Sequence, residues 1–253
     1  MSNYFGFTSD SAYIFLMDID SSGSMDGQVR DMRQGLGLYQ KSFEGLPEIN
    51  SIAVSKCTFN DDFYPDYFRH LRDFNTNYST GGATALYYSI VKGAEMLWEY
   101  VQEVTERKGF TPIATFIVFS DGEPCRDRAT ARQAAEAIDR LNYAGINTVF
   151  VAFGNAISSN FGDDLGFVST IDINDKEALI DFLGVELSNS CKKQSQRNTP
   201  LGAEFFSSSS GQKKDASIGS NFFSKANGQS TSAAFSATTG QALEDDGWLD
   251  EII

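Results

Sequence analysis

Apolar residues in the first 190 positions follow two patterns that alternate along the chain. Short runs such as 12–19 and 113–119 are apolar almost throughout, which is typical of strands buried on both faces of a sheet. Between such runs, apolar residues recur at helical spacing, as Val29, Met32 and Leu36 do. The pattern predicts strands at 12–19, 51–59, 113–119, 148–153 and 167–171, and helices at 26–43, 86–101, 131–141 and 176–187.

Strands that alternate with helices in this way predict an α/β fold. We expect an open, mostly parallel central sheet, Rossmann-like, with helices on both of its faces. Segment 63–68 is different, because Pro65 has no amide hydrogen to donate to a β-ladder. This segment is therefore expected as an antiparallel strand at the edge of the sheet.

The character of the chain changes near its end. Residues 195–239 are rich in Ser, Gly, Ala, Gln and Asn and show no sustained period, so we expect this stretch to be disordered. We divide the chain into an N-terminal extension (1–11), one domain (12–190), a low-complexity tail (191–243) and an acidic, hydrophobic end (244–253).

The tail contains the pattern Phe-Ser-x-x-x-Gly-Gln three times, and its last ten residues combine acidic with apolar side chains. One interpretation is chance similarity in a solvated, Ser-rich tail. The other is a set of docking motifs for a second partner, or for self-contact in which the acidic end supplies a carboxylate to the folded domain. The candidate anchors are Phe206, Phe223, Phe235, Trp248, Leu249 and Ile252.

The charge balance restricts the partners. A formal net charge of −14 disfavours binding to nucleic acid and to anionic membranes. The first residues lack the pattern of a signal peptide, and no apolar segment is long enough to span a bilayer. The cysteines, Cys57, Cys125 and Cys191, are odd in number and far apart, unlike a disulfide framework or a zinc site. We expect a cytoplasmic location.

Oxygen-bearing side chains gather in three loops. Asp20, Ser22 and Ser24 alternate directly after the first predicted strand, Thr84 follows a Gly-Gly pair, and Asp121 lies in a Ser-Asp-Gly turn after the strand at 113–119. Ligands of open α/β sheets bind at the carboxyl ends of strands. Hard divalent cations such as Mg²⁺ prefer oxygen ligands. If the two strands are neighbours, the sequence predicts a cation site there.

These three loops resemble the metal-ion-dependent adhesion site (MIDAS) of the von Willebrand factor type A family, over about residues 12–187. All five positions of that pattern match, in the family's order. The amino-acid sequences of the loops look most like those of microbial intracellular members, including tellurium-resistance-associated proteins. The resemblance implies that Asp20, Ser22, Ser24, Thr84 and Asp121 hold Mg²⁺ or Mn²⁺, partly through waters. It also implies a protein partner that offers an Asp or Glu to the metal, and hence an adaptor rather than an enzyme.

Asp18 departs from the family pattern, which generally has an apolar residue there. By strand alternation it faces the same side as Asp20, so it either acts as a second-shell acceptor for the metal site or pairs with a basic side chain. Two alternatives to the adaptor function stay open. One is a metal-assisted hydrolase using Asp20, Asp121 and Glu123, although the single histidine, His70, offers no Ser-His-Asp arrangement. The other is a regulatory subunit of an ATPase or a kinase–phosphatase system.

Overall fold

A central β-sheet organises the protein. A computed structural model describes residues 13–154, 160–173 and 176–195. The strand order is β3-β2-β1-β5-β6-β7, and β4 also pairs with β2. Pairs among β2, β1, β5, β6 and β7 are parallel, whereas β3 and β4 run antiparallel to β2. The strands are β1 Tyr13–Asp20, β2 Ile52–Phe59, β3 Phe63–Tyr64, β4 Arg69–His70, β5 Ile113–Ser120, β6 Asn147–Phe153 and β7 Ser169–Ile173.

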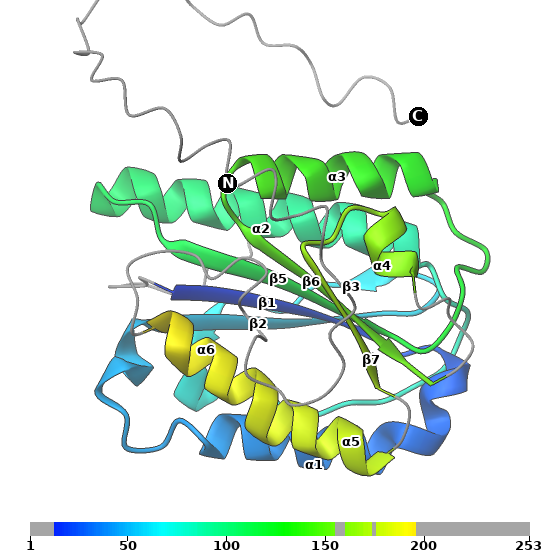
Figure 1. The fold of residues 1–253 in the computed structure, drawn as a ribbon, viewed down its shortest axis with the longest axis horizontal. Helices are drawn as coiled ribbons and strands as arrows, with labels where there is room; N and C mark the ends of the chain where they lie inside the picture. The colour runs from blue at the N-terminus through cyan, green and yellow to red at the C-terminus, as the bar shows by residue number, and fades with distance from the viewer. Residues whose placement is uncertain (1–12, 155–159, 174–175, 196–253) are drawn as a thin grey trace, which may run out of the picture. The chain divides into compact units, whose positions relative to one another are not determined.

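Helices cover both faces of this sheet, as Figure 1 shows, with α2 and α3 on one face and α1, α5 and α6 on the other. The predicted α/β fold, mostly parallel with an antiparallel edge, is therefore confirmed. The long helices are α1 Val29–Lys41, α2 Leu86–Lys108 and α3 Ala131–Tyr143, followed by α5 Lys176–Asp181, the π-helical turn η4 Phe182–Leu187 and α6 Ser188–Ser195. Shorter elements are η1 Gly23–Gln28, η2 Pro47–Ser51, η3 Leu71–Asp73 and α4 Phe161–Asp164.

The core has two layers because successive side chains of a strand point to opposite faces. On β1, Ile14 and Leu16 join the layer under α2 and α3, whereas Phe15 and Met17 join the layer under α1 and η4. Every residue of β1 is buried. The continuous apolar run that predicted this strand thus reflects burial on both faces.

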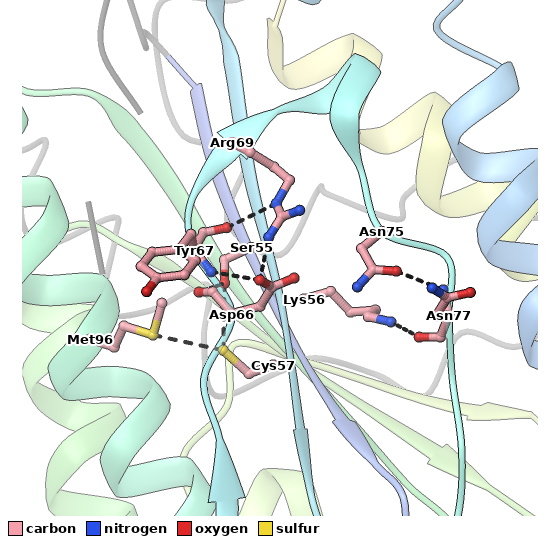
Figure 2. Close-up of polar contacts among 9 residues, drawn as sticks. All are labelled: Ser55, Lys56, Cys57, Asp66, Tyr67, Arg69, Asn75, Asn77 and Met96. Atoms are coloured by element: carbon pink, nitrogen blue, oxygen red, sulfur yellow. Dashed lines mark hydrogen bonds and ion pairs between the residues drawn. The ribbon is translucent and has the colours of Figure 1, made fainter. Parts of the chain in front are cut away.

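The edge of the sheet differs from the prediction of one strand at 63–68. Two short strands, β3 and β4, pair with opposite ends of β2, and Pro65 lies in the interruption between them. Within that interruption the hydroxyl of Ser55 donates to the carbonyl of Asp66 at 2.9 Å, as Figure 2 shows. A side chain of β2 therefore replaces part of the backbone ladder that Pro65 breaks.

Several element boundaries also differ from the sequence-based expectation. Helix α2 continues to Lys108, beyond the predicted 101, and α1 is shorter than the predicted 26–43. The last strand, β7, lies two residues later than predicted. The last helix, expected to end at Leu187, continues through η4 and α6 to Ser195. Cys191 is fully buried there and accepts a hydrogen bond from the hydroxyl of Tyr39. The helix after Leu187 was not predicted, because its buried face is made by Ser and Cys rather than by large apolar residues.

Other predictions fall outside the described residues. They concern the N-terminal extension and the six tail anchors Phe206, Phe223, Phe235, Trp248, Leu249 and Ile252. Among the helices that the structure describes, none is long and apolar enough to cross a membrane.

Candidate metal centre

The carboxyl ends of β1 and β5 lie side by side. This is the condition on which the sequence predicted a cation site. The register pairs Ile19 with Phe119. One residue further on, the hydroxyl of Ser120 donates to Oδ2 of Asp20 at 2.6 Å. The strand order therefore places Asp20 beside the loop that carries Asp121.

The backbone around Asp20 is held by several hydrogen bonds. Its Oδ1 accepts the amide of Ser22 at 2.8 Å, which closes a turn directly after β1. Ser21 is fixed to the carbonyl of Phe59 on β2 by both its amide and its hydroxyl, at 2.7 and 2.8 Å. The buried hydroxyl of Tyr78 donates to the carbonyl of Asp20. The start of the site is thus anchored to two neighbouring segments.

Five oxygen-bearing residues from the three loops form one group, which we call the oxygen cluster: Asp20, Ser22, Ser24, Thr84 and Asp121. The hydroxyls of Ser22 and Ser24 lie 2.9 Å apart, and that of Ser24 donates to Oδ1 of Asp121 at 2.7 Å. Thr84 faces the same point, because a Cβ built on Gly122 would lie 3.8 Å from both Thr84 Oγ1 and Ser24 Oγ. The structure therefore brings together all five residues that the sequence selected.

The negative charge of the cluster is not balanced by a basic side chain. Burial raises the pKa of Asp20 to about 6, although hydrogen bonds from Ser120 and Ser22 act in the opposite direction. Burial also raises the pKa of Asp121, and the bond from Ser24 lowers it. No ion pair joins either carboxylate to a basic side chain within the part of the chain that the structure describes. Two partly buried carboxylates without a counter-charge favour a bound cation.

The donor set fits a hard divalent cation. Two carboxylates and three hydroxyls offer oxygen only, which suits Mg²⁺ or Mn²⁺ better than soft metals. Groups of three or more His, Cys, Asp and Glu in a metal-binding arrangement do not occur among the described residues. The hydroxyls of Ser22, Ser24 and Thr84 would therefore complete the ligand set.

Asp18 faces the same side of β1 as Asp20 but lies deeper. Its carboxylate is fully buried, and neither oxygen has a hydrogen bond of good geometry among the described residues, because the hydroxyl of Ser89 donates to the carbonyl of Leu86 at 3.0 Å instead. Burial raises its pKa to about 8; the nearby hydroxyl of Ser89 acts in the opposite direction, and the charge of Asp20 adds to the rise. Neither of its predicted roles has a contact to support it in the part of the chain that the structure describes, where no basic side chain pairs with Asp18 and no hydrogen bond links it to the cluster.

Some residues near the cluster were missed or stay outside it. Ser120 and Tyr78 hold Asp20, yet the sequence assigned them no role: Ser120 was only part of the Ser-Asp-Gly turn, and Tyr78 carried no signal. Glu123, the candidate base of the hydrolase alternative, is exposed on the loop after β5. His70 lies on the edge strand β4, at the end of β2 that pairs near Ala53 and far along the strand from the cluster.

The fold has counterparts among solved structures. The pilus adhesin SpaC from Lactobacillus rhamnosus GG matches with a TM-score of 0.56 at 12% identity, over 73% of this chain and 30% of that one. Proximal thread matrix protein 1 from the mussel byssus, with a zinc-occupied MIDAS motif, matches with a TM-score of 0.51 at 13% identity, over 71% and 46%. The PilB minor pilin from Streptococcus sanguinis gives 0.50 at 14% identity, over 75% and 63%.

These likenesses concern the fold. The chain spans less than two thirds of each of these structures, between 30% and 63% of their lengths. No protein-family model matches the sequence, and no curated protein matches it. The arrangement of helices and strands shared with these structures agrees with the resemblance noted in the sequence. The chain has a von Willebrand factor type A-like fold.

Proposed function

We propose that this protein is a metal-dependent protein–protein interaction module, an adaptor that binds an acidic residue of a partner protein. The oxygen cluster holds Mg²⁺ or Mn²⁺ through Asp20, Ser22, Ser24, Thr84 and Asp121. When bound, the cation supplies a positive charge with a coordination position open to a carboxylate. The single observation that carries this proposal is the convergence of three loops on one group of oxygens, with no ion pair to a basic side chain among the described residues.

The choice of ligands supports binding rather than catalysis. Three of the five candidate ligands are neutral hydroxyls, so the protein itself neutralises a divalent cation with only two carboxylates. The remaining attraction for an anion would favour an acidic partner residue, despite long-range repulsion from a chain whose net charge is −14. The mussel matrix protein has a zinc-occupied MIDAS motif, which supports a divalent cation at such a site.

The first experiment measures metal binding directly. We expect the full chain to bind Mn²⁺, detected by electron paramagnetic resonance or calorimetry, and Asp121→Asn to lose at least about tenfold in affinity, since a charged ligand is replaced. Asp139→Asn is the matched control, because it removes the same charge from an exposed position on α3. Equal Mn²⁺ affinities in Asp121→Asn and Asp139→Asn would contradict the proposed site.

The second experiment tests partner binding. We expect proteins captured by the full chain from a lysate, identified by mass spectrometry, to be lost with Asp121→Asn and with EDTA but retained with Asp139→Asn. Circular dichroism checks that the variants stay folded. If the same proteins are still captured by Asp121→Asn and in the presence of EDTA, the proposed metal-dependent binding of a partner is wrong.

The finer proposals follow from the same site. We propose a non-enzymatic, cytoplasmic protein similar to the microbial intracellular branch of the family. The tail after Ser195, shorter than the predicted 191–253 because α6 includes residues 191–195, would be an additional docking segment. The hydrolase alternative would be favoured by turnover of phosphoesters that is lost in Glu123→Gln. A regulatory subunit would instead be captured together with an ATPase, kinase or phosphatase.

A further inference from the structure

The helix that follows Thr84 receives its N-terminal cap from a distant loop. Helix α2 begins at Leu86, and its N-cap residue, Ala85, offers no side-chain acceptor. Instead the carboxylate of Asp127, about 40 residues further on, accepts the amide of Tyr87 at 2.6 Å through Oδ2 and that of Tyr88 at 2.9 Å through Oδ1. Two of the free amides that every helix start presents are thereby satisfied by a carboxylate.

The same distant loop also contacts Thr84 itself. The amide of Cys125 donates to the carbonyl of Thr84 at 2.8 Å, in an isolated antiparallel bridge. The loop that begins with Asp121 is therefore joined to the Thr84 segment at two points, one on Thr84 and one in the first turn of α2. A loop held at two points keeps fewer relative conformations than a loop held at one.

Neighbours of Asp127 hold the loop in place. Oδ1 of Asp127 accepts the amide of Ala129 at 3.1 Å, which closes a local turn. The guanidinium of Arg128 lies 4.1 Å from the ring centre of Tyr88 and pairs with Asp62. Arg126, between the two attachment points, has a φ of 57°, a conformation that a residue with a side chain adopts rarely. The attachments at Cys125 and Asp127 act on both sides of this strained residue.

We propose that Asp127 is a positioning residue for the metal centre, an inference that rests on the proposed function. By capping α2, its carboxylate holds the segment of Thr84 against the loop of Asp121, so that the Thr84 hydroxyl and the Asp121 carboxylate face the same cation. Asp127 acts in this arrangement through the start of α2 and not as one of the five proposed ligands, since its oxygens accept the backbone amides of Tyr87, Tyr88 and Ala129.

The test compares Asp127→Asn with Asp139→Asn in the full chain. Asparagine keeps one carbonyl oxygen but loses the charge and the second acceptor. We expect Asp127→Asn to bind Mn²⁺ about tenfold more weakly, since outer contacts that orient metal ligands have effects of this size, while Asp139→Asn binds as the parent does. A lower melting temperature with unchanged Mn²⁺ affinity would overturn the proposal, because it would mean that Asp127 only stabilises the helix.

Hydrogen exchange of the metal-free protein gives a second readout. We expect Asp127→Asn to speed exchange in two separate stretches, 81–88 and 121–129, because the loop and the helix start are released together. Faster exchange in the first turn of α2 alone would overturn the positioning role. A parent protein that binds no Mn²⁺ would instead refute the proposed function, and the exchange experiment would still decide whether Asp127 joins the two loops.

Discussion

Asp18 of β1 reaches α2 at Gly93: a Cβ atom on that glycine would lie 3.5 Å from Asp18 Oδ2. The same atom would lie 2.9 Å from the ring of Phe116, so strand and helix approach closely here. The carboxylate is thus enclosed by the core under the oxygen cluster, with no water-facing side. A buried polar group without a hydrogen bond is costly.

We expect Asp18→Asn to stabilise the protein at neutral pH. The amide has nearly the shape of the carboxylate but carries no charge, so folding no longer requires a buried carboxyl to lose its hydration or to take up a proton. The gain should be about 1 kcal/mol or more in the free energy of unfolding by urea. Metal affinity should change little, because no hydrogen bond among the described residues links Asp18 to the cluster and the raised pKa of its carboxyl keeps it mostly uncharged at neutral pH.

Asp139→Asn is the control for Asp18→Asn, since it also removes one negative charge but at an exposed position. Equal unfolding free energies for parent and Asp18→Asn would mean that the carboxyl has a compensating partner in solution. Weaker Mn²⁺ binding by Asp18→Asn would instead restore the second-shell role considered from the sequence.

The residues of the oxygen cluster could be predicted from local patterns and from the resemblance to a known family, whereas their convergence depended on β1 and β5 being neighbours, as the structure shows. The alternation of Asp20, Ser22 and Ser24 is visible in one loop, and the apolar runs before Asp20 and Asp121 mark both as ends of buried strands. The residues that hold this cluster could not be predicted in the same way. Tyr78 and Asp127 bind backbone groups 58 and about 40 residues away, so only the folded topology identifies their partners.

The same distinction applies to the fold. Buried strands such as β5 are recognisable from their continuous apolar runs. The order of the strands was not predicted and comes from the structure. The predicted end of the last helix was wrong because the buried face of α6 is made by Ser188, Ser190 and Cys191, which give no strong hydrophobic signal. Close glycine contacts between α1 and η4 give no such signal either. A Cβ on Gly184 would lie 2.9 Å from Leu38 of α1, and one on Gly35 would lie 2.6 Å from Leu183. Glycine at a packing contact gives no hydrophobic signal.

Gly35 and Gly37 of α1 should respond oppositely to alanine. In Gly35→Ala the added methyl group would collide with Leu183 of η4, so we expect a loss of about 1–3 kcal/mol in the free energy of unfolding. Gly37 has nothing within 4 Å of its Cβ position, so Gly37→Ala should stabilise the helix by about 0.5–1 kcal/mol. Urea titrations of both variants check the pair. Stabilisation by Gly35→Ala would show that α1 and η4 are not packed as described.

Removing the hydroxyl of Tyr78 should weaken the metal centre through the backbone of Asp20. Tyr78→Phe keeps the buried ring but loses the hydrogen bond to the carbonyl of Asp20. We expect a loss of about 1 kcal/mol in stability and weaker Mn²⁺ binding, because Asp20 is held less firmly. Tyr64→Phe is the matched control, since Tyr64 is half-exposed on β3. Mn²⁺ titration of both variants decides, and identical affinities would contradict the supporting role of Tyr78.

Lys56 holds the segment that leads from η3 toward Thr84. Figure 2 shows its side chain pointing away from Ser55 and Cys57, toward Asn77, whose carbonyl accepts a hydrogen bond from the ammonium group. The next carbonyl, that of Tyr78, accepts from Arg33 of α1 at 2.9 and 2.6 Å. Two cationic side chains thus bind consecutive carbonyls of the segment that carries Tyr78 to the metal centre.

The buried position of Lys56 predicts a specific pH dependence. Burial lowers its pKa from 10.5 to about 8; Asp66 acts in the opposite direction, and Arg69 adds to the lowering. At pH values between these two pKa values, the unfolded chain binds more protons at Lys56 than the folded protein does. The contribution of Lys56 to the free energy of unfolding therefore rises with pH. The parent should therefore gain stability relative to Lys56→Met between pH 7.5 and 9.5, measured by urea unfolding. Relative to Lys41→Met, which changes an exposed lysine of α1, no such gain is expected. A parent that loses stability relative to Lys56→Met over this range would show that the ammonium group is held in its charged form by the fold.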